Sequence, residues 1–425
     1  MHAVQYGSAL SPDRLPAPAF DRADVHAWVE RYLGSVLRGP VQGSPIVGGQ
    51  AAADAALATL DITGYADRRN DVFPADRRGA SGLSPYIRHG LLTLPRVWSD
   101  VHGPARDRAK FRDELLWQEY ARHLYARLGT ATRHSLRFSV PEYMDDDGPG
   151  SWADEGVCVS ESLRELRETG WITNQQRMWL ASHWTVRGGN GWRVGEDDFF
   201  RHLIDGSRAA NRLGWQWTVG ALTGKQYGFS RWQVTHRAPG MCDRCELRDN
   251  CPIEDWPDTG ESEPRTIVDP RIRRDSDSEN TSGPLEPRVT GRPEAVWITA
   301  ESLGDDDPAL GAHVDVPAIF VFDRPLLSNL RLSPVRLVFL AECLADLARR
   351  REVEIFFDDP RDVLAGRRLA ATFTPVPGWR ARAAQMDMVA VHPWPWLRPV
   401  GSGPLTSFSA WQTSSRGSAG GGRRR

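Results

Sequence analysis

The apolar residues of this chain follow two different periods, and the change between them constrains the fold more than any other feature. In the first part of the chain they recur every three to four positions, which is the spacing of one face of a helix. The clearest such windows are residues 22–38, 109–128, 160–169 and 178–186. In the last third, short apolar runs alternate with helical stretches, which is typical of a parallel sheet. These runs are 296–299, 318–322, 353–357, 369–373 and 388–391, and the clearest helix between them is 334–350.

Two low-complexity segments separate and follow these parts. Residues 254–288 hold ten acidic residues and five arginines, are rich in Pro and Ser, and show no apolar periodicity. Such a composition predicts a disordered acidic linker over 254–292, and SSRGSAGGGRRR predicts a disordered basic tail over 413–425. We therefore expect an all-α domain at 1–253 and a smaller α/β domain with a parallel sheet at 293–412.

Charge and hydropathy exclude several classes of protein. The net charge of −2 gives no support for nucleic-acid binding. Without the acidic linker, however, the rest of the chain has a small positive net charge. No run of 18 apolar residues is present, so no transmembrane helix is expected. The first residues lack the pattern of a signal peptide, which favours a cytoplasmic protein. The α/β part contains no GxGxxG and no Walker motif, so it offers no nucleotide site of its own.

Three of the five cysteines form a motif with metal-ligand character. Cys242, Cys245 and Cys251 are spaced C-x2-C-x5-C and are followed by Pro. In a cytoplasmic protein this spacing favours a metal over disulfides. Cys343 belongs to the apolar face of a predicted helix and is expected to be a buried core residue, which leaves Cys158 as the candidate fourth ligand. The residues alone leave an iron–sulfur cluster, a zinc site and no metal open.

Six ordered motifs resemble the cryptochrome/DNA photolyase family. The most specific is DGSRAANRLGWQW at 205–217, which is similar to the family's flavin-binding segment. The others, in family order, are GGQAAADAAL at 48–57, Tyr65 followed by RRND, SGLSPYIRHG at 81–90, ELLWQEY at 114–120 and ETGWITNQQRM at 168–178. The resemblance spans residues 48–235 and implies an all-helical domain that binds FAD.

The resemblance also bears on the cysteines and on the order of the domains. One bacterial subclass of the family is similar in placing four cysteines as Cys158, Cys242, Cys245 and Cys251 are placed, where they hold a 4Fe-4S cluster. This implies a cluster, with zinc as the alternative. VWITAESLGDDDPAL and PAIFVFD resemble the family's N-terminal α/β strands, but here they follow the flavin domain, so the two domains are expected in swapped order.

The resemblance assigns cofactor-binding roles residue by residue. It implies that Tyr65 and the turn Ser81, Gly82, Leu83 and Ser84 hold the FAD diphosphate, through hydroxyl and backbone N–H groups. It implies that Asn174, Arg177 and Asp205 surround the flavin ring, with Arg177 and Asp205 as a buried ion pair, and that Asn211 faces the flavin N5.

The same resemblance implies a lesion pocket and an electron relay. The residues at the positions that bind cyclobutane pyrimidine dimers are Glu114, Trp117, Met178 and Trp217. A dimer flipped out of the duplex needs apolar and aromatic walls and a carboxyl group. Trp215 and Trp192 match the inner and middle relay tryptophans, while Trp184 and Trp179 are candidates for the outer one. Thr173 and Asn174 stand where members that repair six-four lesions have two histidines.

Three departures from the family pattern leave the function open. Gln118 and Gly82 stand where arginine is usual or common, and Ser207 stands where Asp is usual. Each lost cation near the diphosphate removes charge-assisted hydrogen bonds of about 1.5–3 kcal/mol. The first hypothesis is a light-driven photolyase that acts on damaged DNA. The alternatives are a cryptochrome-like signalling flavoprotein and a degenerate protein without FAD. The oligomeric state and any antenna chromophore are not indicated.

Overall fold

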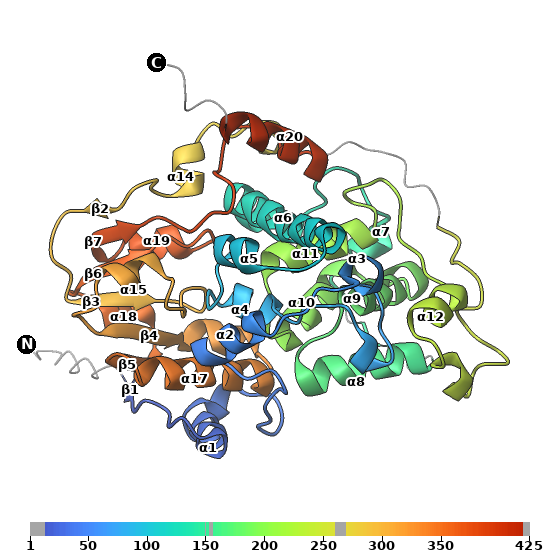
Figure 1. Cartoon of the computed structure of the whole chain (residues 1–425), viewed down its shortest axis with the longest axis horizontal. Helices are drawn as coiled ribbons and strands as arrows, with labels where there is room; N and C mark the ends of the chain where they lie inside the picture. The colour runs from blue at the N-terminus through green and yellow to red at the C-terminus, as the bar shows by residue number, and fades with distance from the viewer. Residues whose placement is uncertain (1–12, 149, 153–155, 260–268, 420–425) are drawn as a thin grey trace, which may run out of the picture.

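The structure is a computed structural model that describes residues 13–148, 150–152, 156–259 and 269–419. A sheet with its covering helices forms one end of the molecule, and a group of helices forms the other (Figure 1). The helices of the first part are α1 (Arg22–Leu33), α2 (Gln50–Ala58), α3 (Tyr65–Arg68), α4 (Ser84–Arg88), α5 (Leu94–Asp100), α6 (Ala105–Leu128), α7 (Glu142–Asp145), α8 (Val157–Thr169), α9 (Asn174–Ser182), α10 (Trp192–His202), α11 (Arg208–Thr218) and α12 (Arg231–Arg237).

The helices that position the site have clear start and stop signals. Thr173 and Gln176 form a reciprocal capping box at the start of α9. Ser207 caps α11 by accepting a hydrogen bond from the backbone N–H of Ala209. The long helix α6 ends at Gly129, whose φ of 57° is accessible to glycine. The predicted helical windows are confirmed, and the last of them continues from α9 into a π-helical turn at His183–Arg187.

The sheet contains seven strands in the order β1-β5-β4-β3-β6-β7-β2. They are β1 (Arg14–Leu15), β2 (Arg288–Val289), β3 (Ala295–Ile298), β4 (Ala318–Asp323), β5 (Val353–Asp358), β6 (Arg368–Thr372) and β7 (Asp387–His392). The five central strands are parallel, as predicted from the apolar runs. The prediction of a purely parallel sheet is wrong at both edges, because β1 and β2 pair antiparallel with β5 and β7.

The helices of the α/β part are short except for one. They are α15 (Pro308–Ala312), α16 (Arg324–Leu330), α17 (Pro334–Ala348), α18 (Pro360–Leu364) and α19 (Trp379–Ala383). Helix α17 is buried along almost its whole length and lies between the sheet and the helices α1 and α2. The two parts of the chain therefore meet on α17.

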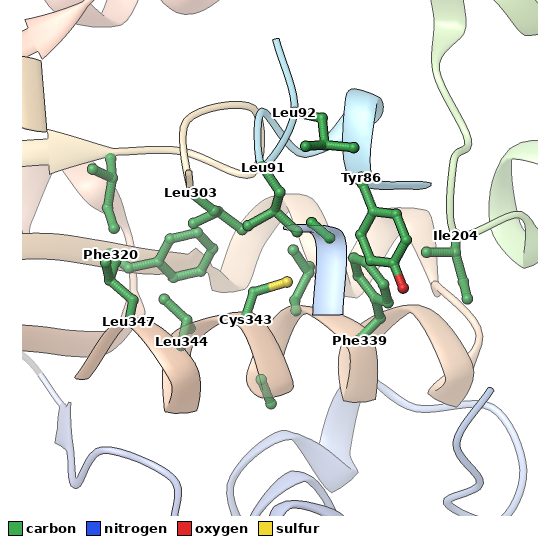
Figure 2. Close-up of a cluster of buried hydrophobic side chains, with 14 of the residues drawn as sticks. Tyr86, Leu91, Leu92, Ile204, Leu303, Phe320, Phe339, Cys343, Leu344 and Leu347 are labelled. Carbon is green, nitrogen blue, oxygen red and sulfur yellow. The ribbon is translucent and has the colours of Figure 1, made fainter. Parts of the chain in front are cut away.

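Specific contacts fix the first family motif against α17. The backbone N–H of Gly48 donates to Glu342, and that of Gln50 donates to Asp346, each at 2.7 Å. A Cβ atom at Gly48 would lie 2.4 Å from the backbone oxygen of Phe339, so only glycine permits this approach. One hydrophobic core accordingly includes residues of both parts. Figure 2 shows Cys343 within it, beside Leu303 and Leu91, which confirms the predicted core role of that cysteine.

The predicted disordered linker is wrong for residues 269–292. They form α13 (Pro270–Arg273), α14 (Ser278–Ser282) and β2. Ile272 is buried under α6, and the carboxylate of Asp275 lies 3.3 Å from the guanidinium of Arg127 with both side chains buried. An acidic, proline-rich composition predicts disorder only when its charges have no partners, and these have partners on a distant helix. Residues 260–268 lie outside the described part of the chain.

The predicted disordered tail is likewise wrong for residues 413–419, which belong to α20 (Phe408–Ala419). The buried indole of Trp411 donates to Nδ1 of His123 at 2.9 Å, so α20 is anchored on α6 and continues beyond this anchor. The last six residues are outside the described part. Among the described residues, no helix is long and apolar enough to span a membrane.

Candidate functional site

The motifs that carry the family resemblance contact one another in the fold. The indole of Trp171 donates to the hydroxyl of Ser84 at 3.0 Å. The guanidinium of Arg88, four residues further on, donates to the backbone oxygen of Gly206 at 3.1 Å. Three segments that are far apart in the sequence, 81–90, 168–178 and 205–217, therefore line one region of the helical part.

The predicted ion pair between Arg177 and Asp205 is present. The guanidinium of Arg177 lies 2.8 Å from Oδ2 of Asp205 and also donates to the backbone oxygen of Ile172. Asp205 is buried, and its other carboxylate oxygen, Oδ1, has no hydrogen-bond partner in the structure. A buried acceptor without a partner is costly, so this oxygen suits a ligand that carries an N–H donor, as the edge of an isoalloxazine ring does.

Asn211 and Glu196 form a second buried polar pair. The side-chain amide of Asn211 donates to the backbone oxygen of Glu196 and to its carboxylate Oε1, each at 2.9 Å. Arg208 and Arg212 contact the other carboxylate oxygen at 2.5 and 3.5 Å. Burial raises the pKa of Glu196 above its ordinary value, while Arg208 opposes that shift. The sequence reasoning missed Glu196, because no spacing pattern joins it to Asn211.

Tyr65 and its short helix α3 lie against the start of α6. Both carboxylate oxygens of Asp107 accept backbone N–H groups at the start of α3, from Gly64 at 3.0 Å and from Ala66 at 2.8 Å. The Tyr65 ring packs edge-on against Phe111 at 5.0 Å. Burial raises the pKa of the Tyr65 hydroxyl above its ordinary value, so this group donates hydrogen bonds as a neutral phenol.

The turn from Ser81 to Ser84 has the conformation that its sequence requires. Gly82 has a φ of 67°, and a Cβ atom built there would meet no other atom within 4 Å. The hydroxyl of Ser81 accepts from the backbone N–H of Leu83 at 3.4 Å, and the Leu83 side chain is buried. Two of the three departures fit the local structure, since an arginine at Gly82 would be strained and Ser207 caps its helix as an Asp would.

The four predicted lesion-pocket residues come from three neighbouring helices, α6, α9 and α11. Trp117 and Trp217 are each 38% exposed, which is a large exposure for tryptophans. The sulfur of Met178 accepts from the hydroxyl of Thr218, next to Trp217, at 3.9 Å. Glu114 is held by Lys110 at 2.8 Å and by Arg69 at 3.2 Å.

Asn174 is the exposed first residue of α9, three residues before Arg177 on the same helix.

Aromatic contacts link Trp215 to Trp152 and Trp184. Trp215 is buried and meets Phe199 edge-on at 5.0 Å. Phe199 stacks at 6.1 Å on Trp152, which meets Trp184 at 4.6 Å. A Cβ atom at Gly195 would lie 2.2 Å from the Trp215 ring and 3.0 Å from that of Trp184, so glycine lets both rings approach one backbone position.

The other two predicted tryptophans make different contacts. Trp192 is fully buried and its indole donates to Asp145 at 3.3 Å. Trp179 packs against Phe229 at 5.9 Å and donates to Gln233. The contacts therefore favour Trp184 over Trp179 as a relay partner of Trp215. They also add Trp152, which the sequence reasoning did not single out because no motif contains it.

The four predicted ligand cysteines line one hollow. Cys158 lies at the start of α8, and Cys242, Cys245 and Cys251 lie in the loops after α12. Burial first, and then the nearness of the other three thiols, raises the pKa of Cys158 to about 12. All of these thiols are free. Within the described ranges, no three His, Cys, Asp or Glu side chains are close enough together to hold a metal ion.

The matches to known proteins include helical segments that form this site. Residues 111–238 match the family described as the FAD-binding domain of DNA photolyase. This segment of the chain is therefore similar to the flavin-binding part of the cryptochrome/DNA photolyase family. A deoxyribodipyrimidine photo-lyase of Synechococcus sp. is 34% identical over 195 residues, which are 42% of this chain and 40% of that protein. A corresponding enzyme of Thermus thermophilus is 32% identical over 186 residues, 41% of this chain and 43% of the relative.

Two solved structures of the family are also similar over part of their length. One is a class III photolyase from Agrobacterium tumefaciens, with 25% identity and a TM-score of 0.34 over 40% of this chain and 37% of the neighbour. The other is a cryptochrome of Synechocystis sp. PCC6803, with 19% identity and a TM-score of 0.39 over 47% and 46%. The chain spans about 40% of the length of the curated relatives described above.

Proposed function

We propose that this protein is a flavin-dependent enzyme that uses light to repair cyclobutane pyrimidine dimers in DNA. The observation that carries the proposal is the pairing of Arg177 with the buried Asp205, whose other carboxylate oxygen has no partner among the described residues. This pair lies where motifs of the FAD-binding domain meet. Bound FAD, when fully reduced, would supply a light-excited electron to the dimer and accept it back after the ring splits.

The chain's own residues have distinct tasks in this proposal. Arg177 balances negative charge beside the ring, and Asp205 accepts a hydrogen bond through Oδ1. Tyr65 and the Ser81–Ser84 turn hold the diphosphate. Asn211 is kept in place by Glu196, whose buried carboxylate accepts a hydrogen bond from the side-chain amide of Asn211 at Oε1.

The second group of residues receives the substrate. Trp117, Trp217 and Met178 provide apolar walls for a flipped dimer, and Glu114 provides the carboxylate for its base edges. The pairing of Glu114 with Lys110 and Arg69 orients the carboxylate. Damaged DNA is accordingly the proposed partner, and a cytoplasmic location is part of the same proposal.

The arrangement of domains is also a proposal. The α/β part would correspond to the domain that precedes the flavin domain in the family, placed here after it. Support comes from its parallel strands and from the close packing of the 48–57 motif on α17. Residues 269–292 would then be an ordered connection along α6 rather than a free linker.

The purified protein tests this assignment through its visible absorption spectrum and its response to light. We expect FAD bound in equal amount to the chain, and about a tenfold or greater loss of FAD affinity in Asp205→Asn. Asp197→Asn, at a half-exposed position, is the matched control and should bind FAD normally. A chain that contains no flavin after reconstitution with FAD would exclude the proposal.

A cryptochrome-like signalling flavoprotein is the alternative, and the substitutions at Gln118, Gly82 and Ser207 favour it. The two candidates differ in one property. A repair enzyme removes dimers from DNA under blue light once its flavin is fully reduced, whereas a signalling protein binds flavin and leaves the dimers intact.

We further propose that Cys158, Cys242, Cys245 and Cys251 hold a 4Fe-4S cluster, with zinc as the alternative. The support is the hollow that all four cysteines line. A cluster would tie the loops after α12 to α8. Metal analysis tests this. We expect four iron atoms per chain, lost in Cys158→Ala and kept in the control Cys343→Ala. One zinc atom and no iron would overturn the cluster.

A further inference from the structure

The C-terminal helix places an aromatic ring flat on one of the predicted lesion-pocket tryptophans. Phe408, the first residue of α20, stacks on Trp117 with ring centroids 4.0 Å apart and planes 8° apart. Helix α20 lies along α6, which carries Trp117 (Figure 1). Trp117 is nevertheless 38% exposed. Phe408 therefore covers one face of the indole, and a substantial part of the ring stays accessible.

Tyr120 supports both stacked rings from the side. Its ring meets Trp117 and Phe408 edge-on, each at 5.9 Å and 81°. The Tyr120 hydroxyl donates to the backbone oxygen of Leu405 at 2.9 Å, so the segment that leads into α20 is tied to the same side chain. Two parallel rings thus stand on a third ring that is itself buried.

The position of Phe408 does not depend on its own contacts alone. Trp411, three residues later, is buried and donates to Nδ1 of His123 at 2.9 Å. Arg127 also donates to the backbone oxygens of Gly401 and Gly403, each at 2.8 Å. The segment before α20 and the first turn of α20 are therefore fixed to α6, which argues for a permanent wall rather than a movable cover.

We propose that Phe408 is a positioning residue for the substrate, which fixes the plane of the Trp117 ring so that its accessible face receives the π-face of a pyrimidine base flipped out of DNA. The proposal rests on the proposed function. An indole held by stacking loses little further freedom when a base binds, whereas a mobile indole must be ordered at that moment. The ligand class is thus an unpaired pyrimidine, and an intact duplex does not use this contact.

Equilibrium binding by the full-length, FAD-loaded protein tests the role. Affinities are measured for an oligonucleotide with a single thymine dimer and for its undamaged duplex. We expect Phe408→Ala to weaken dimer binding about three- to tenfold and to leave undamaged binding unchanged. Phe408→Leu keeps an apolar side chain but no ring and should behave like Ala, while Phe408→Tyr should restore binding. Phe20→Ala, at an exposed phenylalanine that contacts Arg349, is the control and should change neither affinity.

The outcomes separate the two proposals. A wild-type protein that does not distinguish dimer from undamaged DNA contradicts the proposed function itself. If the wild-type protein prefers the dimer and Phe408→Ala binds the dimer with the same affinity as the wild type, only the role of Phe408 is overturned. Tighter dimer binding by Phe408→Ala also overturns it, because the ring would then be a cover on the pocket.

The ring itself can be observed without DNA. In protein labelled with 5-fluorotryptophan, the ¹⁹F resonance of Trp117 is identified by its absence in Trp117→Phe. We expect this resonance to shift and sharpen in Phe408→Ala and Phe408→Leu, and to keep its position in Phe408→Tyr. An unchanged resonance in Phe408→Ala would show that the stack does not hold the indole, and would overturn the inference.

Discussion

The side-chain amide of Asn211 donates two hydrogen bonds to Glu196, one to the backbone oxygen and one to the carboxylate, both at 2.9 Å. By resemblance Asn211 faces the flavin N5, so this pair places a buried carboxyl group one side chain away from that atom. Burial raises the pKa of Glu196, and the neighbouring Arg208 and Arg212 oppose that shift. We propose that this carboxyl group exchanges a proton with its surroundings when the flavin is reduced.

Glu196→Gln tests that role. Glutamine keeps the size of the side chain and a carbonyl oxygen for Asn211, but it carries no transferable proton. We expect the variant to bind FAD normally and to slow light-driven reduction by an external thiol by about 100-fold. The half-exposed neighbour Asp197, which also pairs with Arg208, serves as the control. Equal reduction rates for wild type and Glu196→Gln would rule out the role.

The aromatic contacts of Trp215 predict which tryptophans serve in electron transfer. Trp215→Phe and Trp184→Phe should each slow light-driven flavin reduction at least about tenfold without loss of FAD. Trp179→Phe should have no effect, because Trp179 is equally buried but packs on Phe229 instead. Transient absorption after a laser flash measures these rates. A large effect of Trp179→Phe, or none of Trp215→Phe, would contradict the assignment.

Because residues 269–292 are ordered along α6, we expect the removal of the charge of Asp275 to destabilise the protein strongly. The side chains of Arg127 and Asp275 are only 2% and 6% exposed, so Asp275→Asn leaves a buried arginine without its partner and should cost about 3–5 kcal/mol of unfolding free energy. The pair Arg106–Asp67 is 72% and 62% exposed, and Asp67→Asn should cost at most about 1 kcal/mol. Urea unfolding measures both. Equally small losses of unfolding free energy in both variants would instead support a disordered linker.

His89, in the 81–90 motif, is expected to make the folding stability of the protein decrease at low pH. Its Nδ1 lies 2.7 Å from the backbone oxygen of Ala300 and its Nε2 lies 3.1 Å from that of Ile204. The ring therefore lies between the two parts of the chain and, when neutral, donates to one of these oxygens. Burial first, and then the neighbouring Arg88, lowers the pKa of His89 to about 3.

The direction of this pH dependence of folding stability follows from proton binding. The unfolded chain takes up a proton below pH about 6.5, and the folded chain does not, so folding stability falls as the pH is lowered through that value. Between pH 7 and pH 5 the loss from this residue should be about 2 kcal/mol. His89→Gln should lack that component in urea unfolding at the two pH values. An identical pH dependence of wild type and variant would contradict it.

Helices and strands with a clear apolar periodicity could be predicted from the sequence. Elements that depend on contacts with residues far away in the sequence could not. Helices such as α6 and α17 and the five parallel strands are long enough for their apolar residues to show a spacing. Strands β1 and β2 are two residues each and exist only because β5 and β7 offer unpaired edges. Residues 269–292 are ordered by partners on α6, more than a hundred residues earlier in the sequence.

The candidate site shows the same division. The Arg177–Asp205 pair could be predicted, because the family motifs contain both residues. Glu196 and Phe408 could not. Glu196 lies 15 residues before Asn211 with no shared motif, and Phe408 lies beyond the last predicted strand and in none of the motifs. Trp152 was missed for a similar reason, since its role comes from a contact with Trp184 across the fold.

The measurement that tests the central claim most directly is the amount of thymine dimer left in an oligonucleotide after blue-light illumination with the fully reduced protein. We predict that the dimer is converted to two intact thymines over repeated turnovers. We predict no loss in the dark, and a loss at least about tenfold slower with Glu114→Ala. A flavin-loaded, fully reduced protein that leaves every dimer intact under blue light would contradict the account.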